Sequence, residues 1–179
     1  MVRLFICVKI PENVKKKLVV AQKDLKNDKI NAKFVEEENL HLTLIFIGET
    51  KEEKINETKN YMTESAKKTK SFHVNLTGIK LFPSDYNIRV IGVKVLSENL
   101  NFVISEFNKD IKGLSHETNK ITLCRLRKNL KKDSLKDFIE KYSLFNFGKI
   151  HVNKIHLVKS TLTRDGPIYE DVHEVKLNE

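Results

Sequence analysis

The fold is decided by residues 39–48, which read Asn39-Leu40-His41-Leu42-Thr43-Leu44-Ile45-Phe46-Ile47-Gly48. The run is apolar apart from its first residue and one imidazole and one hydroxyl two positions apart, and it predicts a buried β-strand. Because side chains alternate between the two faces of a strand, His41 and Thr43 should point the same way, roughly 7 Å apart. Leu42, Leu44 and Phe46 are then expected on the opposite face, in the core. The stretch therefore predicts a core strand that offers one His and one Thr on its other face.

A similar phrase returns in the second half of the chain, as Lys120-Ile121-Thr122-Leu123-Cys124-Arg125. Two other pieces recur in the same order at similar spacing: residues 73–75 are repeated at 151–153, and residues 3–9 are echoed at 89–95. Three recurring segments in one order indicate an internal duplication, with halves of about 1–86 and 87–179, each built as strand, helix, motif strand, helix, strand. Two copies predict two similar lobes that face each other rather than a solenoid.

Length and composition bound the kind of protein. A chain of 179 residues that is 40% hydrophobic can form one domain, residues 1–179. Its 33 Lys and Arg exceed its 24 Asp and Glu and give a net charge of +9, which favours an anionic partner such as nucleic acid, although many lysine-rich faces are simply solvated. Cys7 and Cys124 lie far apart in apolar stretches, which indicates buried thiols and no structural zinc. No apolar run reaches the ~18 residues of a membrane span, so we expect a cytoplasmic protein with no membrane partner.

Strands and helices are expected to alternate along the chain. The predicted strands cover 2–10, 29–35, 39–48, 72–82, 88–96, 119–126, 148–159 and 168–177, and helices are expected from Pro11, over 51–69, after Ser97 and after Asp133 or Ser134. Residues 160–167 are expected to form a hydroxyl-rich turn. Because the connections allow hairpins, these patterns predict an α+β fold. We expect a bilobal molecule with two pseudo-symmetric lobes of mixed or antiparallel sheet and outer helices around a central cleft.

The repeated motif predicts phosphate chemistry. Two lobes related by approximate two-fold symmetry would place His41 and Thr43 across the cleft from Lys120 and Thr122. An imidazole transfers protons near neutral pH, hydroxyls donate hydrogen bonds to phosphate oxygens, and cations offset developing negative charge. Such a site needs no metal and no other cofactor. The residues and the basic composition therefore predict a phosphodiester substrate, in RNA or in a nucleotide.

Further candidate substrate contacts follow from side-chain chemistry. Arg125 suits a pair of phosphate oxygens, but strict alternation along the second motif strand predicts Cys124 on the cleft side, so Arg125 needs a bulge or a strand end to join the site. Lys159 and Ser160 are additional candidate phosphate contacts. Tyr169, like Phe46, could stack on a base, although a core position is the simpler interpretation for an aromatic residue.

The ordered set of motifs resembles the RNA 2′,3′-cyclic phosphodiesterases, also called 2′-5′ RNA ligases, of the two-histidine phosphoesterase superfamily. The resemblance is carried by residues 3–6, 34–44, 82–83 with 88–91, 121–125, 159–162 and 166–170. It implies a bilobal fold with a V-shaped cleft and an enzyme that opens the 2′,3′-cyclic phosphate of an RNA end to a 2′-phosphate, with 2′-5′ ligation as a related activity. In this family the first-motif His donates a proton to the leaving oxygen, so the resemblance gives that role to His41. The second-motif His accepts a proton from water.

One departure from the family pattern lies at the second motif, where Lys120 stands in place of the His. A lysine has a reference pKa of ~10.4 against ~6.5 for histidine, so acting as a base at neutral pH would require a depression of about three units, roughly 4 to 5 kcal/mol. Loss of a general base typically costs ~100-fold to ~10,000-fold in rate. Three hypotheses remain: a slow, monomeric enzyme in which Lys120 is an electrostatic clamp, a non-catalytic binder of RNA termini or nucleotides, and a site in which His116 moves into the position.

Overall fold

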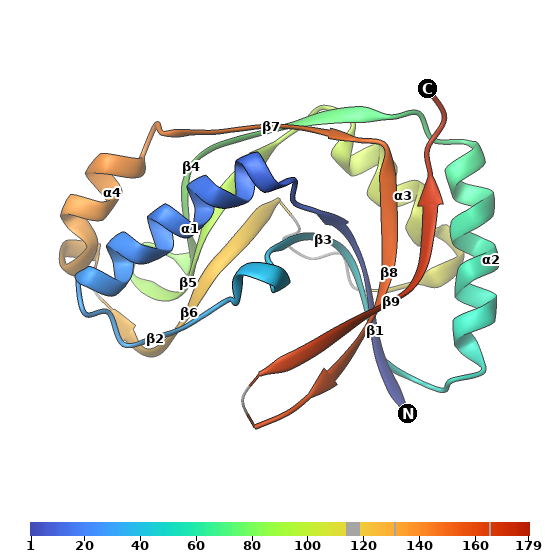
Figure 1. The fold of residues 1–179 in the computed structure, drawn as a ribbon, viewed down its shortest axis with the longest axis horizontal. Coiled ribbons are helices and arrows are strands. Elements are labelled where there is room, and N and C mark those ends of the chain that lie inside the picture. The colour runs from blue at the N-terminus through green and yellow to red at the C-terminus, as the bar shows by residue number, and fades with distance from the viewer. Residues whose placement is uncertain (114–118, 131, 165) are drawn as a thin grey trace.

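The structure is a computed structural model of the chain and describes residues 1–113, 119–130, 132–164 and 166–179 (Figure 1). Its elements are, in order, β1 (Val2–Lys9), α1 (Glu12–Asn27), β2 (Ala32–Phe34), η1 (Glu37–Asn39), β3 (His41–Thr50), α2 (Lys54–Lys67), β4 (Phe72–Ser84), β5 (Asn87–Leu96), α3 (Leu100–Ile111), β6 (Lys120–Leu130), η2 (Lys132–Leu135), α4 (Lys136–Tyr142), β7 (Asn146–Val152), β8 (Lys154–Leu162) and β9 (Pro167–Lys176). The predicted α+β class is confirmed. None of the helices that the structure describes is long and apolar enough to cross a membrane.

The strands form two antiparallel sheets. The first sheet has the order β3-β1-β8-β9 and the second has the order β2-β6-β5-β4-β7. Helices α2 and α3 pack together against the first sheet, and α1 and α4 pack against the second (Figure 1). The motif strands β3 and β6 thus belong to different sheets. Each sheet has one face buried by helices, which leaves its other face available for a site.

The two sheets do not coincide with the two sequence halves. Strands β8 and β9 come from the second half, yet they pair with β1 in the first sheet. Conversely, β4 comes from the first half and lies between β5 and β7 in the second sheet. The expectation of one lobe per half is therefore corrected: each lobe combines strands from both ends of the chain. The duplication itself stays a prediction.

The buried faces follow the spacing of the apolar residues along each element. In α1 the stripe of Val14, Leu18, Ala21 and Leu25 is buried, as helical spacing requires. In β1 the side chains alternate, with Leu4, Ile6 and Val8 in the main core and Arg3, Phe5, Cys7 and Lys9 on the other face. The first sheet consequently presents a second, partly apolar face away from its helices.

One predicted strand, 148–159, is wrong as a single element. Val152, at the end of β7, pairs with Phe72 in the second sheet, whereas Lys154, at the start of β8, pairs with Lys176 in the first. The chain changes sheet at Asn153, between two strands with similar apolar patterns. Strand β8 also extends through Leu162, so the first part of the predicted 160–167 turn is strand.

Candidate active site

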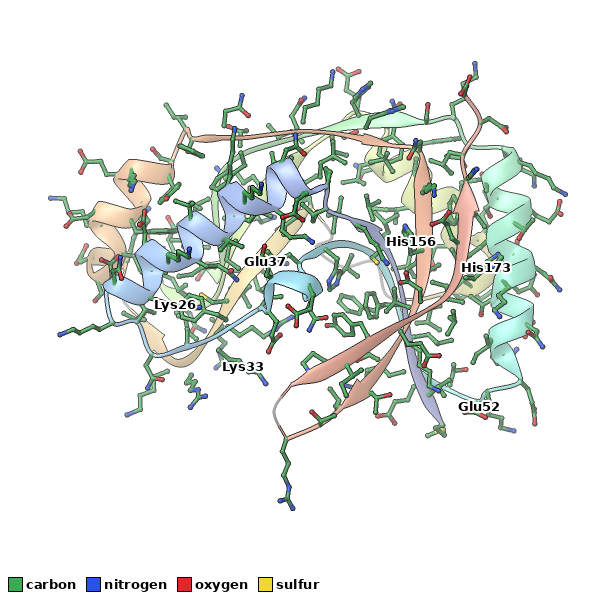
Figure 2. All side chains as sticks on the ribbon, in the orientation of Figure 1. Lys26, Lys33, Glu37, Glu52, His156 and His173 are labelled. Atoms are coloured by element: carbon green, nitrogen blue, oxygen red, sulfur yellow. The ribbon has the colours of Figure 1, made fainter. Side chains whose placement is uncertain are left out.

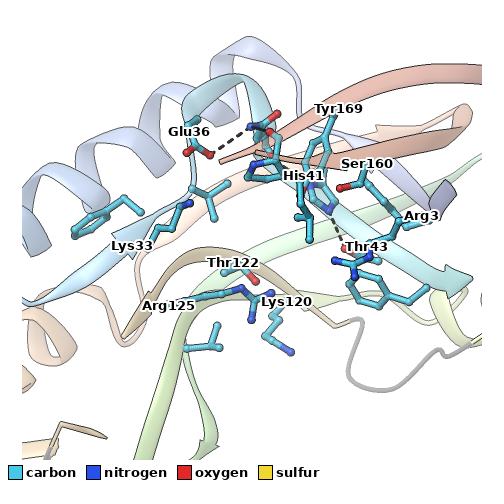
Figure 3. Close-up of a pocket in the computed structure, with 18 of the residues that line it drawn as sticks. Arg3, Lys33, Glu36, His41, Thr43, Lys120, Thr122, Arg125, Ser160 and Tyr169 are labelled. Atoms are coloured by element: carbon cyan, nitrogen blue, oxygen red, sulfur yellow. Dashed lines mark hydrogen bonds between the residues drawn. The ribbon is translucent and has the colours of Figure 1, made fainter. Parts of the chain in front are cut away.

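A cleft of about 500 Å³ lies between the two sheets and receives both motif strands (Figure 3). His41 and Thr43 reach it from β3, and Lys120 and Thr122 reach it from β6 on the opposite wall. The structure therefore brings the two pairs together around one opening. Arg125 also lines this cleft.

Two further predicted substrate contacts have different positions. Ser160 lines the cleft together with Tyr169, its partner on β9. Lys159 does not line the cleft, because it pairs with Leu4, whose side chain lies in the main core on the other face of the sheet. The expected contact from Lys159 is corrected on this ground. His116 lies outside the residues that the structure describes.

A β-bulge in each motif strand decides which side chains enter the cleft. On β3, Thr43 pairs with Cys7 while Ile45 pairs with Ile6, so Leu44 is an extra residue. The extra residue reverses the alternation after it. As a result Phe46, expected in the core, is 43% exposed and lines the cleft.

The second motif strand has its bulge at the matching place. Thr122 pairs with Gly92 and Cys124 with Ile91, which leaves Leu123 as the extra residue. Arg125 is thereby turned to the cleft side, while Cys124 is buried. The bulge that the sequence required for Arg125 is present.

The ring of His41 is held at both nitrogens. Its Nδ1 lies 2.7 Å from the backbone oxygen of Asn39, which can only accept, so Nδ1 carries a hydrogen. Its Nε2 lies 2.9 Å from Oγ1 of Thr43. Phe5 packs at 4.9 Å between ring centroids, and the edge contact with Tyr169 is 5.5 Å. These contacts fix the imidazole so that Nε2 and the Thr43 hydroxyl face the cleft together.

The pKa of His41 is lowered from its ordinary value. Burial is the largest cause, because it disfavours the imidazolium, and the charge of Arg125 acts in the same direction. The hydrogen bond to Asn39 acts against them, since a carbonyl oxygen favours the protonated ring. His41 therefore loses its proton more readily than an exposed histidine does.

The rest of the cleft wall carries cationic and aromatic side chains beside Glu36, Asn39 and a few aliphatic residues. The ammonium of Lys120 lies 4.5 Å from the centre of the Phe82 ring, an arrangement that stabilises the charged form. Arg3, which donates to Glu49 at 3.0 Å, lines the cleft, as does Lys33, which extends from β2 toward the β8–β9 hairpin (Figure 2). Both residues were missed as site residues in the sequence. The position of Arg3 could have been predicted, because Arg3 lies two residues before Phe5 on the same strand and therefore shares its face.

A buried amide, also missed, ties the two motif regions together. Gln22 of α1 is 4% exposed, and its Nε2 donates to the carbonyl oxygens of Val35 at 2.7 Å and of Leu123 at 2.8 Å. Val35 precedes η1 and His41, and Leu123 is the bulge residue of β6. The sequence signal was a glutamine set between the buried positions Leu18 and Leu25 of an apolar stripe. Gln22 thus holds the approach to one motif against the backbone of the other.

Comparisons with known proteins agree with this architecture. Residues 8–92 match the family model described as LigT like Phosphoesterase. The chain is 37% identical over 177 residues to the RNA 2′,3′-cyclic phosphodiesterase of Methanocaldococcus jannaschii, and the match covers 96% of this chain and 99% of the relative. It is 34% identical over 160 residues to the protein of that name from Aquifex aeolicus, covering 83% and 84%.

Solved structures give the same result at the level of the fold. The protein TT0787 of Thermus thermophilus superposes with a TM-score of 0.81 at 26% identity, covering 98% of this chain and 97% of that one. LigT of E. coli in its apo form superposes with a TM-score of 0.79 at 18% identity, covering 99% and 98%. With near full-length similarity in sequence and in structure, the chain belongs to the LigT-like phosphoesterase family.

Proposed function

We propose that this protein hydrolyses the 2′,3′-cyclic phosphate at RNA ends to a 2′-phosphate. The observation that carries the proposal is the opposed pair of motifs, with His41 and Thr43 on one wall of the cleft and Thr122 with two cations on the other. The curated relatives named RNA 2′,3′-cyclic phosphodiesterase support the substrate class. A monomer is sufficient, because all of these side chains come from one chain.

The reaction breaks one phosphorus–oxygen bond and forms another. A water oxygen attacks phosphorus, the bond from phosphorus to O3′ breaks, and O3′ takes a proton from Nε2 of His41, which leaves a 3′-hydroxyl and a 2′-phosphate. The water proton passes to solvent, and His41 is reprotonated from solvent. His41 must be an imidazolium to act in this way, with Nδ1–H still held by Asn39. An RNA 5′-hydroxyl in place of water would give a 2′-5′ linkage by the same bond changes.

The other cleft residues stabilise the phosphate. Thr43 and Thr122 donate hydrogen bonds to its non-bridging oxygens, and Arg125 binds a pair of them through its planar guanidinium. Lys120 contributes a fixed positive charge rather than a base, as its contact with Phe82 supports. Because Lys120 is a poor base, we propose that turnover is slow. Ser160 is a further proposed contact.

A second candidate function is a non-catalytic binder of RNA termini or nucleotides. The position of the Lys120 ammonium over Phe82 favours it, because a permanent cation improves phosphate binding without activating water. This function uses the same cleft and the same phosphate contacts. It differs only in the absence of turnover.

One experiment separates the two functions. Wild type and His41→Ala are incubated with 2′,3′-cyclic AMP, and with RNA ending in a cyclic phosphate, in the presence of a chelator. The enzyme hypothesis predicts slow formation of the 2′-phosphate by wild type, and its loss in His41→Ala. Activity that needs added metal would contradict the proposed metal-independent chemistry. Binding without product in wild type would support the binder.

A further inference from the structure

The cleft-side face of the second sheet continues past the cleft as an open surface. Residues directly opposite each other on antiparallel strands share a face. Lys120 in the cleft pairs with Lys94 on β5, so Lys94 shares its face. Leu96, two residues further along β5, follows by alternation and is 53% exposed. The face therefore extends from the catalytic cleft across β5.

The same reasoning carries the surface across two more strands. Leu96 pairs with Asn75 on β4, and Asn75 pairs with Lys149 on β7. The next pair on this face is His73 of β4 with His151 of β7, whose rings stack at 4.8 Å between centroids and 26° between planes. All of these side chains are exposed. Lys94, Leu96, Asn75, Lys149, His73 and His151 are called the outer platform below.

The opposite face of these strands is buried. The residues between the platform positions, such as Val74, Val95 and Ile150, lie in the main core, which α1 and α4 cover. The platform itself is covered by none of the described helices. The platform is therefore a solvent-exposed surface next to the cleft.

The platform is positively charged. Lys94 and Lys149 form no ion pair with any residue in the described parts of the chain, and no Asp or Glu is a platform residue. The pKa of His73 is lowered by desolvation and by the nearby charges of Lys149 and His151, which favours the neutral form of the His73 ring at pH 7. Two lysines beside two stacked imidazoles and an exposed leucine combine phosphate-binding and base-stacking chemistry.

We propose that the outer platform binds the single-stranded RNA that precedes the cyclic phosphate end. This inference rests on the proposed function, since it takes the terminal phosphate to lie in the cleft. Three strand spacings of ~4.8 Å separate β6 from β7, about 14 Å in all. At ~3.4 Å per phosphate, at most about four nucleotides would span this distance. The lysines would contact phosphates, and Leu96 and the histidine pair would pack against bases.

Single-stranded RNA is the occupant that the surface favours over a protein. The platform is contiguous with the phosphate-binding cleft through the pair Lys120 and Lys94. The positive charge of the platform complements a polyanion. Its lysines lie on β5 and β7 beside side chains that are flat or apolar. An open sheet face with stacking side chains suits unpaired bases, whereas a duplex would present only its backbone.

The test compares a short substrate with a long one. We would measure kcat/KM for 2′,3′-cyclic AMP and for a single-stranded RNA octamer ending in a 2′,3′-cyclic phosphate, using wild type and Lys94→Gln/Lys149→Gln. The matched control is Lys16→Gln/Lys23→Gln, which removes two exposed lysines from α1 on the other side of the same sheet. The single variant Lys149→Gln tests the contribution of one platform lysine, which lies on β7, two strands away from Lys94 on β5.

The proposal predicts a selective loss. The ratio of kcat/KM for the octamer to that for the mononucleotide should fall about three- to tenfold in the platform variant, and the slope of log kcat/KM against log salt for the octamer should become shallower by about 1.4, or ~0.7 per phosphate contact. Lys149→Gln should show about half of the slope change. The α1 control should leave both quantities as in wild type. An unchanged ratio and slope in the platform variant would overturn the proposal.

Failure of the proposed function is distinguishable from failure of this inference. If wild type turns over neither substrate, the same variants are compared by fluorescence anisotropy with the labelled octamer. Weaker binding with a shallower salt slope in the platform variant, but not in the α1 control, would support the platform without catalysis. Equal binding by all three proteins would overturn it.

Discussion

Replacing Lys120 by histidine should raise the rate of the proposed hydrolysis. The two motif strands have the same residue spacing and a bulge directly after the threonine, so they present their side chains in the same way. In the first motif this geometry places the imidazole Nε2 2.9 Å from the Thr43 hydroxyl. An imidazole at position 120 should therefore lie beside Thr122 in the same manner and face the attacking water.

The magnitude follows from the fraction of base available at pH 7. With a reference pKa of ~10.4, only about one lysine in 2,500 is neutral, whereas most histidines with a pKa of ~6.5 are. A positioned general base contributes ~100-fold to ~10,000-fold. We therefore expect Lys120→His to raise kcat by that range, about 2.7 to 5.4 kcal/mol of barrier at ~1.36 kcal/mol per tenfold change. KM should rise, because a permanent cation near the phosphate is lost.

The assay is hydrolysis of 2′,3′-cyclic AMP under saturating substrate, followed by chromatography of the 2′-phosphate. Lys120→Gln is the control, because it also removes the charge but supplies no base, and it should show no gain. The gain in Lys120→His should disappear when His41→Ala is added. The reasoning is refuted if Lys120→His is folded, binds the nucleotide and turns over no faster than wild type.

Three further predictions concern protonation and packing. His41 must be protonated to act as an acid, and its pKa lies below the ordinary value of about 6.5. We therefore expect kcat/KM to fall about tenfold per pH unit as the pH rises from about 6.5 to about 8. A pH profile that is flat or rising in this range would contradict the role of His41. Gln22→Met should lower the free energy of unfolding in urea by about 1 to 3 kcal/mol, because the Val35 carbonyl loses the Gln22 donor while the Leu123 carbonyl keeps the Val35 N–H, and an unchanged midpoint would show that the amide is dispensable. Burial raises the pKa of the Cys7 and Cys124 thiols to about 12, so Ellman's reagent at pH 8 should label neither in the native protein and both after denaturation; prompt native labelling would argue against their burial.

The site was largely predictable because its elements follow side-chain alternation. His41 and Thr43 share a face as their spacing requires, and the repeated frame placed Thr122 opposite them. Alternation alone predicted Phe46 in the core, and this prediction was wrong. An extra residue in a strand leaves no mark in an apolar run such as Leu44-Ile45, so the reversal appears only when the strand is paired with its neighbour.

The arrangement of the strands was less predictable than their existence. The apolar pattern over 148–159 continues without Gly or Pro at Asn153, although the backbone changes sheets there. Which sheet a strand joins depends on contacts with Phe72 or Lys176, far away in the sequence. Lys159 illustrates the consequence, since its face is set by pairing with Leu4 and not by its neighbours along the chain.

Because the two sheets exchange strands, neither half of the sequence can form a complete sheet by itself. If the backbone were cut at the turn between β4 and β5, the amino-terminal fragment would hold β1 without β8 beside it and β4 without β5 or β7. The carboxy-terminal fragment would be left with the complementary open edges. Neither fragment could close its own ladders, so the two would have to reassemble as a pair, and the intact protein should melt as one cooperative unit.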